Sequence, residues 1–381
     1  MKKISSLLVI TMLLTNLFLV NVFADEENKD EIIDLSIEKA IEDGIKNSDL
    51  IEIQKHAIEV EEVKRRQAIS QERKYDDAID MASDFGIRLE IEGTDEGIYL
   101  SNNMLTEQAE VSLKREKLKN EYNIEDLKMN ITKAYYMSLI AGKNLDIADN
   151  NLENTKRNEE IVNKKYELGV ASKSDLLFAQ IEVDEAKSNL ETAKKDKDKA
   201  FRSLNMALDY ELDTKLNLTS EFQKVENERD LEADLKKSYE TRLDYIDSKN
   251  TAELARKDLE TLDDRYAENT YKYRIAQGNT LRAEKAYDAK EKAVEFDVKN
   301  KYDAIDSEYR KIELAKSTVE KAKEALRLKE LSYEAGMGTL LQVKEARNSF
   351  YKAELNLSNS ILNYNIAILD YKKAVTIGNI N

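Results

Sequence analysis

The sequence predicts an all-α dominated fold built from a few very long helices, and two observations predict it. First, its 381 residues include no proline and only ten glycines, whereas average usage would give roughly 5% proline and 7% glycine. Because these two residue types end or kink helices, few breaks are expected. Second, a turn of the form Tyr-Glu-x-Gly occurs twice, at 166–169 and at 333–336. We therefore expect a duplicated unit of long antiparallel helices.

Composition excludes several classes of function. The chain has no cysteine and a single histidine, His56, so disulfides, thiol catalysis and cysteine or histidine-pair zinc sites are excluded. The 76 acidic and 60 basic residues give a net charge of −16, which disfavours nucleic acid as a partner because phosphates need a basic surface. No phosphate-binding or serine-hydrolase motif occurs. We predict no enzyme activity, no catalytic residue, no cofactor and no metal site.

Residues 1–24 have the pattern of a signal peptide. Two lysines precede an apolar run from Ile4 to Val20, and Ala24 follows as a small residue at a cleavage position. About 20 apolar residues could also just span a bilayer, so an uncleaved anchor is the alternative. The remainder, 25–381, has no comparable apolar stretch. We expect an exported protein of the cell envelope.

Eight helices are expected in the rest of the chain. In chain order, their ranges are 34–46, 48–82, 102–167, 173–208, 228–241, 243–276, 279–334 and 340–375. The helix 102–167 would be roughly 100 Å long at 1.5 Å per residue. It matches the combined length of 48–82 and 173–208, which predicts two half-length helices stacked end to end beside one full-length helix. The two repeats are predicted to cover about 30–215 and 225–378.

The second half carries a heptad pattern. Apolar or aromatic residues recur every seven residues at Val298, Ile305, Ile312, Val319, Leu326 and Tyr333. This spacing predicts coiled-coil packing, and an ordinary helical-bundle core would explain it equally well. Helices of this length leave one protomer with little globular core. Oligomerisation or a long antiparallel coiled coil is therefore expected.

A short insertion distinguishes the first half from the second. Residues 86–92 alternate apolar and polar side chains, 93–97 have the composition of a turn, and the apolar run 98–100 follows. This pattern predicts one short β-hairpin within 84–102. The second half has Gly278 at the corresponding place, where we expect a tight turn between two helices.

The two turns and their surroundings also resemble a known family. The segments 165–177 (KYELGVASKSDLL) and 332–343 (SYEAGMGTLLQV) are each followed by an alanine- and asparagine-rich helix. Together with the duplicated architecture, they resemble the TolC family of outer-membrane efflux proteins over nearly all of 25–381. The resemblance implies a homotrimer whose twelve long helices form a hollow α-barrel. It implies a passive exit duct for an efflux or secretion system, working with an adaptor (membrane fusion) protein and an ABC or proton-driven pump.

The resemblance also implies roles for residues of both turns. The adaptor would dock on small residues at the entrance of the barrel, namely Gly169, Ala171, Ser172, Gly336, Gly338 and Thr339. The gate would consist of Asp175, Tyr333, Gln342 and Glu345, with a hydrogen bond from Tyr333 to Asp175 that holds the entrance closed. Family members carry an arginine where this sequence has Gly338, and an acidic residue where it has Gln342. A looser or less cation-selective gate is therefore expected.

The family's membrane part is expected to be largely missing. Family members insert two strands per half, which in a trimer give a twelve-stranded membrane β-barrel. One short hairpin cannot supply it, because a membrane strand needs roughly 9–11 residues. We therefore expect membrane association through partners, in an outer membrane as in the family or at the extracytoplasmic surface of a single-membrane bacterium. A secreted coiled-coil structural or surface-interaction protein, with no transport role, is the alternative function.

Overall fold

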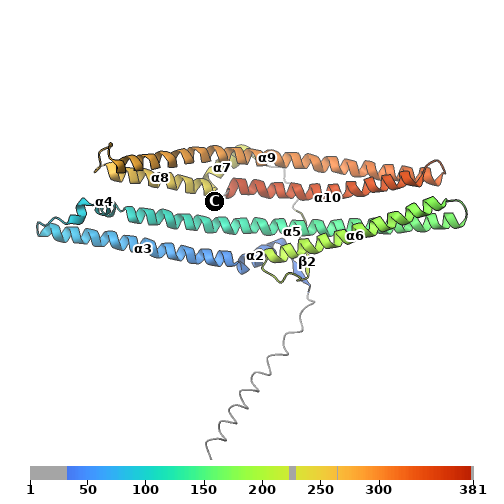
Figure 1. The fold of residues 1–381 in the computed structure, drawn as a ribbon, viewed down its shortest axis with the longest axis horizontal. Helices are drawn as coiled ribbons and strands as arrows, with labels where there is room; N and C mark the ends of the chain where they lie inside the picture. Colours follow the sequence, from blue (N-terminus) through green and yellow to red (C-terminus); the bar gives the residue numbers. More distant parts are fainter. Residues whose placement is uncertain (1–31, 223–228, 264, 379–381) are drawn as a thin grey trace, which may run out of the picture.

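Two long antiparallel hairpins organise the molecule, and each contains one helix that runs along most of its length (Figure 1). The computed structural model describes residues 32–222, 229–263 and 265–378; the predicted signal peptide lies outside them. The helices α5 (Met104–Glu167) and α9 (Tyr271–Glu334) have 64 residues each, so both are roughly 100 Å long. The predicted fold of very long helices is confirmed.

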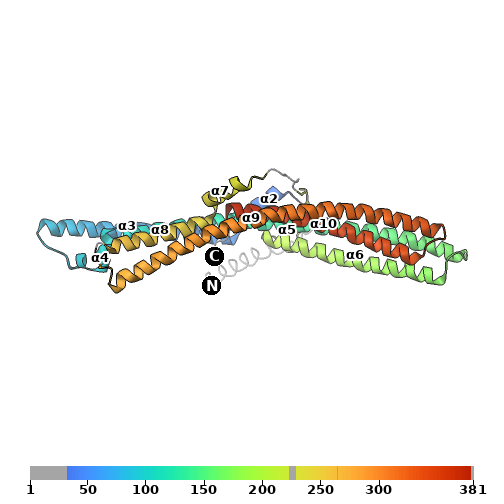
Figure 2. The same ribbon diagram turned by 90° about the horizontal axis from the view of Figure 1, so that it is seen from above.

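Shorter helices lie end to end beside each long helix (Figures 1 and 2). In the first half, α3 (Asp49–Asp84) and α6 (Lys173–Ala207) pack along opposite ends of α5. In the second half, α8 (Leu243–Asp263) and α10 (Leu340–Thr376) pack in the same way along α9. The stacking predicted from helix lengths is therefore present in both halves.

The middle of the molecule, where the short helices meet, holds the remaining small elements. Helices α2 (Ile37–Asn47) and α7 (Leu231–Thr241) lie there. Strands β1 (Ile33–Leu35) and β2 (Leu216–Leu218) pair in parallel, with Ile33 opposite Leu216. These strands were not predictable from the sequence, because three residues are too few to show an alternating pattern.

Tyr135 of α5 ties this small sheet to the long helix. Its ring is fully buried, and its hydroxyl donates to the carbonyl oxygen of Leu35 at 2.9 Å. The same hydroxyl accepts from the backbone N–H of Ser220 at 2.8 Å. Both strand segments are thus fixed to α5 by one buried side chain whose hydrogen-bonding capacity is fully used.

The heptad residues of α9 form the apolar core of the second half. Val298, Ile305 and Ile312 are at most 5% exposed and pack against α10. Leu326 and Tyr333, the last two heptad positions, are partly buried nearer the turn. The heptad pattern therefore marks the buried face of α9 along most of the α9–α10 hairpin.

The predicted β-hairpin within 84–102 is wrong. The segment forms a short 3₁₀ helix, η1 (Glu90–Gly93), and then the helix α4 (Asp95–Ser101). Thr94 caps α4, since its hydroxyl accepts from the backbone N–H of Gly97 at 3.1 Å. A β-carbon on Gly97 would lie 2.0 Å from a carbonyl oxygen of η1. The glycine read as a turn residue is therefore a close-packing position inside a helix.

The turn expected at Gly278 lies earlier in the chain. Helix α8 ends at Asp263, and α9 begins at Tyr271. Thr270 caps α9 by accepting from the backbone N–H of Tyr273 at 3.3 Å. Gly278 lies inside α9 on an exposed face, with no atom within 4 Å of an ideal β-carbon. A glycine inside a helix costs about 1 kcal/mol, which a helix of this length tolerates.

Ion pairs join the two halves along α5. From the α4 end toward the middle of the molecule, the pairs are Glu107–Lys257, Arg115–Asp247, Asp126–Lys373 and Lys133–Asp370. The larger apolar clusters lie mostly within one half or the other. Each half is therefore held together mainly by apolar packing, and the ion pairs add polar contacts between the halves.

Candidate functional site

Both Tyr-Glu-x-Gly turns lie at the same end of the molecule, which we call the turn end (Figures 1 and 2). The first turn connects α5 to α6, and the second connects α9 to α10. A set of buried apolar side chains, which we call the turn-end cluster, packs between the two hairpins here. Its members, each at most 4% exposed, are Val162, Leu176, Ala179, Leu340 and Val343. The duplication thus places two equivalent turns side by side.

Glycine is required where each turn leaves its helix. Gly169 has φ +72°, and its N–H donates to the carbonyl oxygen of Tyr166 at 2.9 Å. The next N–H, of Val170, donates to the carbonyl oxygen of Lys165 at 2.8 Å. These two bonds are the Schellman motif that ends many helices. Gly336, with φ +74°, makes the two equivalent bonds in the second turn.

Alanine at Gly169 or Gly336 is expected to lower the free energy of unfolding by about 1–2 kcal/mol, because a β-carbon is strained at positive φ. Urea unfolding followed by circular dichroism measures the change. Gly142, inside α5 with no atom within 4 Å of an ideal β-carbon, is the matched control. Alanine there is expected to be neutral or stabilising. A loss at Gly142 as large as at Gly336 would contradict the assignment of strain to the turns.

Gly338 lies close to the end of the preceding helix. A β-carbon there would lie 3.0 Å from the Ser332 hydroxyl oxygen and 3.2 Å from the backbone nitrogen of Tyr333. The second turn therefore packs closely against the last turn of α9. Ala171, a small residue of the first turn, packs against the turn-end cluster. Small side chains keep both turns compact, and adaptor docking on them stays a prediction.

Two of the predicted gate residues cap helices. The hydroxyl of Ser172 accepts from the backbone N–H of Asp175 at 3.1 Å, and the Asp175 carboxylate accepts from the Ser172 N–H at 2.9 Å. Thr339 and Gln342 make the same reciprocal pair, at 3.4 Å each. These are capping boxes. The side chains of Asp175 and Gln342 are therefore turned back toward the turns that they follow.

Tyr333 lies near Asp175 without a hydrogen bond to it. Its ring packs against the turn-end cluster, with Lys165 Nζ 4.8 Å from the ring centroid. Burial first, and then the negative charge of Asp175, raise the pKa of Tyr333 above its usual value. The Asp175 carboxylate is bonded to Ser172 instead. In the described part of the protomer the two gate residues are thus neighbours, and their link stays a prediction.

Glu345, the last predicted gate residue, is exposed on α10, as is Gln342 three residues before it. At this spacing the two side chains share one face of the helix. A constriction formed by copies of this face would present one carboxylate and one amide per protomer. Their place in an assembled channel stays a prediction.

Large apolar side chains project from both turns into solvent. Leu168, Val170 and Met337 are 77%, 75% and 81% exposed. Three exposed apolar side chains at one end of a molecule are typical of a contact surface. The docking residues predicted from the sequence are only the small residues of the turns. The available signal was a leucine, a valine and a methionine at turn positions, where polar residues are usual.

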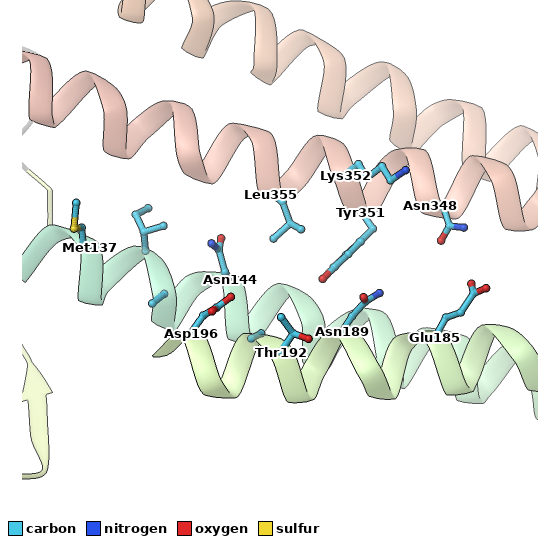
Figure 3. Close-up of a pocket in the computed structure, with 13 residues that line it drawn as sticks. Met137, Asn144, Glu185, Asn189, Thr192, Asp196, Asn348, Tyr351, Lys352 and Leu355 are labelled. Atoms are coloured by element: carbon cyan, nitrogen blue, oxygen red, sulfur yellow. The ribbon is translucent and has the colours of Figure 1, made fainter. Parts of the chain in front are cut away.

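An open groove of about 670 Å³ lies behind the turns, between α6 and α10 over α5 (Figure 3). Asn144, Asn189 and Tyr351 point toward one another across it, with Glu185 at one end and Met137 at the other. Its described lining mixes amides, carboxylates and apolar groups and contains no serine, cysteine or histidine.

Other parts of the described chain give no sign of a chemical site. The His56 side chain is 69% exposed and pairs with Glu59 at 3.1 Å on its own helix. Among residues 32–222, 229–263 and 265–378, no group of three potential ligands is placed to hold a metal ion. In the same ranges, no helix is both long and apolar enough to cross a membrane.

A family model matches part of the sequence, and several solved structures resemble most of the fold. Residues 261–370, which contain nearly all of the α9–α10 hairpin and its turn, match the family model described as outer membrane efflux protein. No curated protein matches the chain in sequence.

Several solved structures resemble the chain over most of its length. A membrane protein from Pseudomonas aeruginosa superposes with a TM-score of 0.72 at 12% identity, over 89% of this chain and 93% of that one. For CusC the TM-score is 0.69 at 13% identity, over 94% and 96%. For the outer membrane protein VceC from Vibrio cholerae it is 0.69 at 13% identity, over 90% and 96%. At such identities the likeness is one of fold.

The efflux-family match over residues 261–370 agrees with the prediction that the chain is not an enzyme. The matched family segment includes the second turn and the positions of Tyr333, Gln342 and Glu345. The resemblance to the TolC family of outer-membrane efflux proteins, predicted from the two turns, is therefore confirmed, by sequence over residues 261–370 and by fold over most of the described chain.

Proposed function

We propose that the protein is the passive exit duct of an efflux or secretion system, assembled as a homotrimer in the cell envelope. One observation carries the proposal: two full-length helical hairpins end in equivalent turns at the same end, and one of them matches the efflux family. Four helices of each protomer reach the turn end. Three protomers supply twelve, enough to form a wall around a channel.

Exposed apolar side chains along the flanks support an assembly of several copies. Ile53, Val60 and Val63 of α3, and Phe296 and Leu314 of α9, are 52–69% exposed. A single protomer would leave these apolar side chains in water, which monomeric proteins avoid over long stretches. Neighbouring copies in a ring would cover them.

Negative-stain imaging of the purified protein tests the duct. Trimeric particles with a central hole in end view are the expected result, with a mass three times that of the protomer by light scattering. Solid rods without a hole would instead support the secreted coiled-coil structural or surface-interaction protein, which needs neither the paired turns nor the efflux-family match.

The turn end is the proposed docking site for the adaptor, and an ABC or proton-driven pump would supply the energy through it. The exposed Leu168, Val170 and Met337 offer apolar contacts, while Gly169 and Gly336 let a partner helix approach the backbone closely. Such a combination suits a helical hairpin of the adaptor laid against the turns.

Aspartate in place of Met337 is expected to weaken binding of an adaptor encoded beside this protein by about tenfold or more, because it puts an unpaired charge into the interface. Surface plasmon resonance measures the change. Met206, 70% exposed in the last turn of α6 near the middle of the molecule, is the control, and Met206→Asp should leave binding unchanged. Equal effects of the two substitutions would contradict docking at the turns.

Asp175, Tyr333, Gln342 and Glu345 are the proposed lining of the entrance. Removal of the Tyr333 hydroxyl is expected to raise the conductance of the assembled trimer, because that hydroxyl would hold the entrance closed through Asp175. Tyr333→Phe is compared with Tyr309→Phe, a partly exposed tyrosine on the same helix but away from the turns. Unchanged conductance in Tyr333→Phe would exclude this link as the closing contact.

A further inference from the structure

Four charged side chains connect α6 to α10 just behind the turn-end cluster. Arg347 Nη1 lies 3.2 Å from a Glu182 carboxylate oxygen, and Lys344 Nζ lies 3.1 Å from one of Glu185. The acids are three residues apart on α6, and the bases are three residues apart on α10. Because α6 and α10 both run away from the turn end, the two ion pairs cross between the facing helix surfaces. We call this set the ladder.

The inner pair of the ladder is buried among all four helices of the turn end. The side chains of Glu182 and Arg347 are 4% and 8% exposed. Arg347 also donates to Glu330 of α9 at 3.0 Å, and Asn158 of α5 donates to Glu182 at 3.4 Å. Burial raises the pKa of Glu182, and the Arg347 guanidinium opposes that rise. Removal of the Arg347 guanidinium would therefore leave the Glu182 carboxylate buried without its main compensating charge.

The segment of α10 that carries the ladder is loosely packed on both sides. The groove of Figure 3 lies on one side and includes Glu185 and Tyr351 in its lining. A second cavity of about 560 Å³ lies between α5, α9 and α10, and Arg347 and Tyr333 are among its lining residues. Beyond the turn-end cluster, Tyr351 of α10 packs against the apolar cluster of α5 and α6 that contains Val183 and Ala186. A helix segment that lies beside open cavities opens locally at a lower cost than a close-packed core.

We propose that the ladder is the latch that fixes the spacing between the two hairpins at the turn end. If the proposed duct is right, it thereby sets the width of the entrance. Apolar contacts such as those of the turn-end cluster have no fixed direction and tolerate sliding. A buried ion pair holds only one geometry. In the described chain the ladder is also the set of ion pairs that links α6 directly to α10, whereas Asp175 is bonded within its own turn.

The absence of cysteine from the sequence makes a direct test simple. Spin labels on cysteines introduced at the exposed Val170 and Met337 report the distance between the turns by double electron–electron resonance. Labelled chains are mixed with an excess of unlabelled chains, so that each assembly holds one pair. Arg347→Gln is expected to lengthen and broaden this distance. It should also speed amide hydrogen exchange in the first turns of α10 on the order of a hundredfold.

Two controls test whether the effect of Arg347→Gln comes from the loss of its ion pair with Glu182. Arg327, exposed on α9 and paired at 2.7 Å with Glu324 of the same helix, is the matched arginine, and Arg327→Gln should leave the distance unchanged. Glu182→Gln and the double variant complete a double-mutant cycle with Arg347→Gln. If Glu182 and Arg347 interact directly, the effects of the two single substitutions on the distance will not add up to the effect of the double variant. Far-UV circular dichroism shows whether each variant is folded.

An unchanged distance in a folded Arg347→Gln, or strictly additive effects, would overturn the latch. The cycle can be measured whatever the assembly state. Rods without a central hole would overturn the proposed duct and leave a positive cycle standing, whereas a trimeric ring with additive effects would overturn the latch alone.

Discussion

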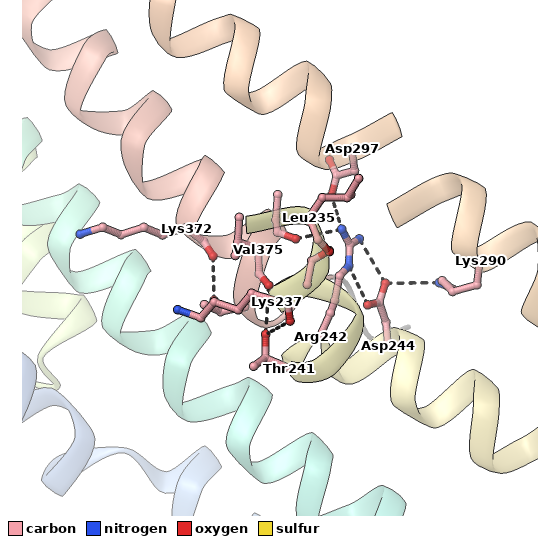
Figure 4. Close-up of polar contacts among 12 residues, drawn as sticks. Leu235, Lys237, Thr241, Arg242, Asp244, Lys290, Asp297, Lys372 and Val375 are labelled. Carbon is pink, nitrogen blue, oxygen red and sulfur yellow. Dashed lines mark hydrogen bonds and ion pairs between the residues drawn. The ribbon is translucent and has the colours of Figure 1, made fainter. Parts of the chain in front are cut away.

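Leucine in place of Arg242 is expected to lower the free energy of unfolding by about 3–5 kcal/mol, the cost of breaking a buried ion pair from one side. Arg242 lies between α7 and α8, at the middle of the molecule (Figure 4). Its side chain is 4% exposed, as is that of its partner Asp244. Without the guanidinium, the Asp244 carboxylate would keep one cation, Lys290, at 3.4 Å.

The size of this effect follows from what Arg242 joins. It binds Asp244 at 2.8 Å, Asp297 of α9 at 2.9 Å and the carbonyl oxygen of Ala374 near the end of α10 at 3.0 Å. The chain after α10 closes over it, since a β-carbon on Gly378 would lie 2.2 Å from Arg242 Nε. One side chain therefore fixes the point where α8 and α10 meet end to end beside α9.

Urea unfolding followed by circular dichroism measures the change. Arg256→Leu is the matched control, because Arg256 is 54% exposed and pairs with Glu284 at 2.8 Å on the surface. Exposed ion pairs contribute little to stability, so no measurable change is expected there. A loss for Arg242→Leu no larger than for Arg256→Leu would contradict the structural role of the cluster.

The long helices could be predicted from the sequence because their signals are local and repeated. Missing proline, the heptads of α9 and the glycine turns each act within a few residues, and all three indicate the same architecture. The predictions of a hairpin within 84–102 and of a turn at Gly278 were wrong, because at these glycines other local features favour a helix. Gly97 is a turn residue by composition, but the Thr94 cap and close packing against η1 make it helical. Gly278 is tolerated inside α9 because Thr270 provides a better helix start.

Some residues of the candidate site could be predicted from the sequence and others could not. The turn glycines and the capping residues were predictable, because a positive φ and a capping box depend on neighbours in the chain. The ladder was not. Glu182 and Arg347 are 165 residues apart in sequence, and in a chain with 36% charged residues nothing marks these two as buried. Their pairing depends on how the hairpins pack, which the pattern of a single sequence does not record.

Alanine in place of Leu340 is expected to lower the free energy of opening of the turn end by about 2–5 kcal/mol, the usual cost of removing a buried leucine side chain. Leu340 is the first residue of α10, is 1% exposed, and packs in the turn-end cluster with Val162 and Leu176. The turn end lies far from the larger cores of the two halves. The loss should therefore appear mainly as local opening, with faster amide hydrogen exchange around both turns.

Leu341 provides the control, because it is the next residue of the same helix turn and is 49% exposed. Leu341→Ala should leave exchange at the turns nearly unchanged, and equal effects of the two substitutions would contradict the packing seen at Leu340. The same measurement separates the apolar cluster from the ladder. Leu340→Ala leaves Glu182 and Arg347 paired, so exchange at the turns should rise while the spin-label distance between the hairpins keeps its mean. Arg347→Gln should change the mean distance, because it removes the ion pair with Glu182, which has a fixed geometry. The turn-end cluster remains, but its apolar contacts do not fix one geometry.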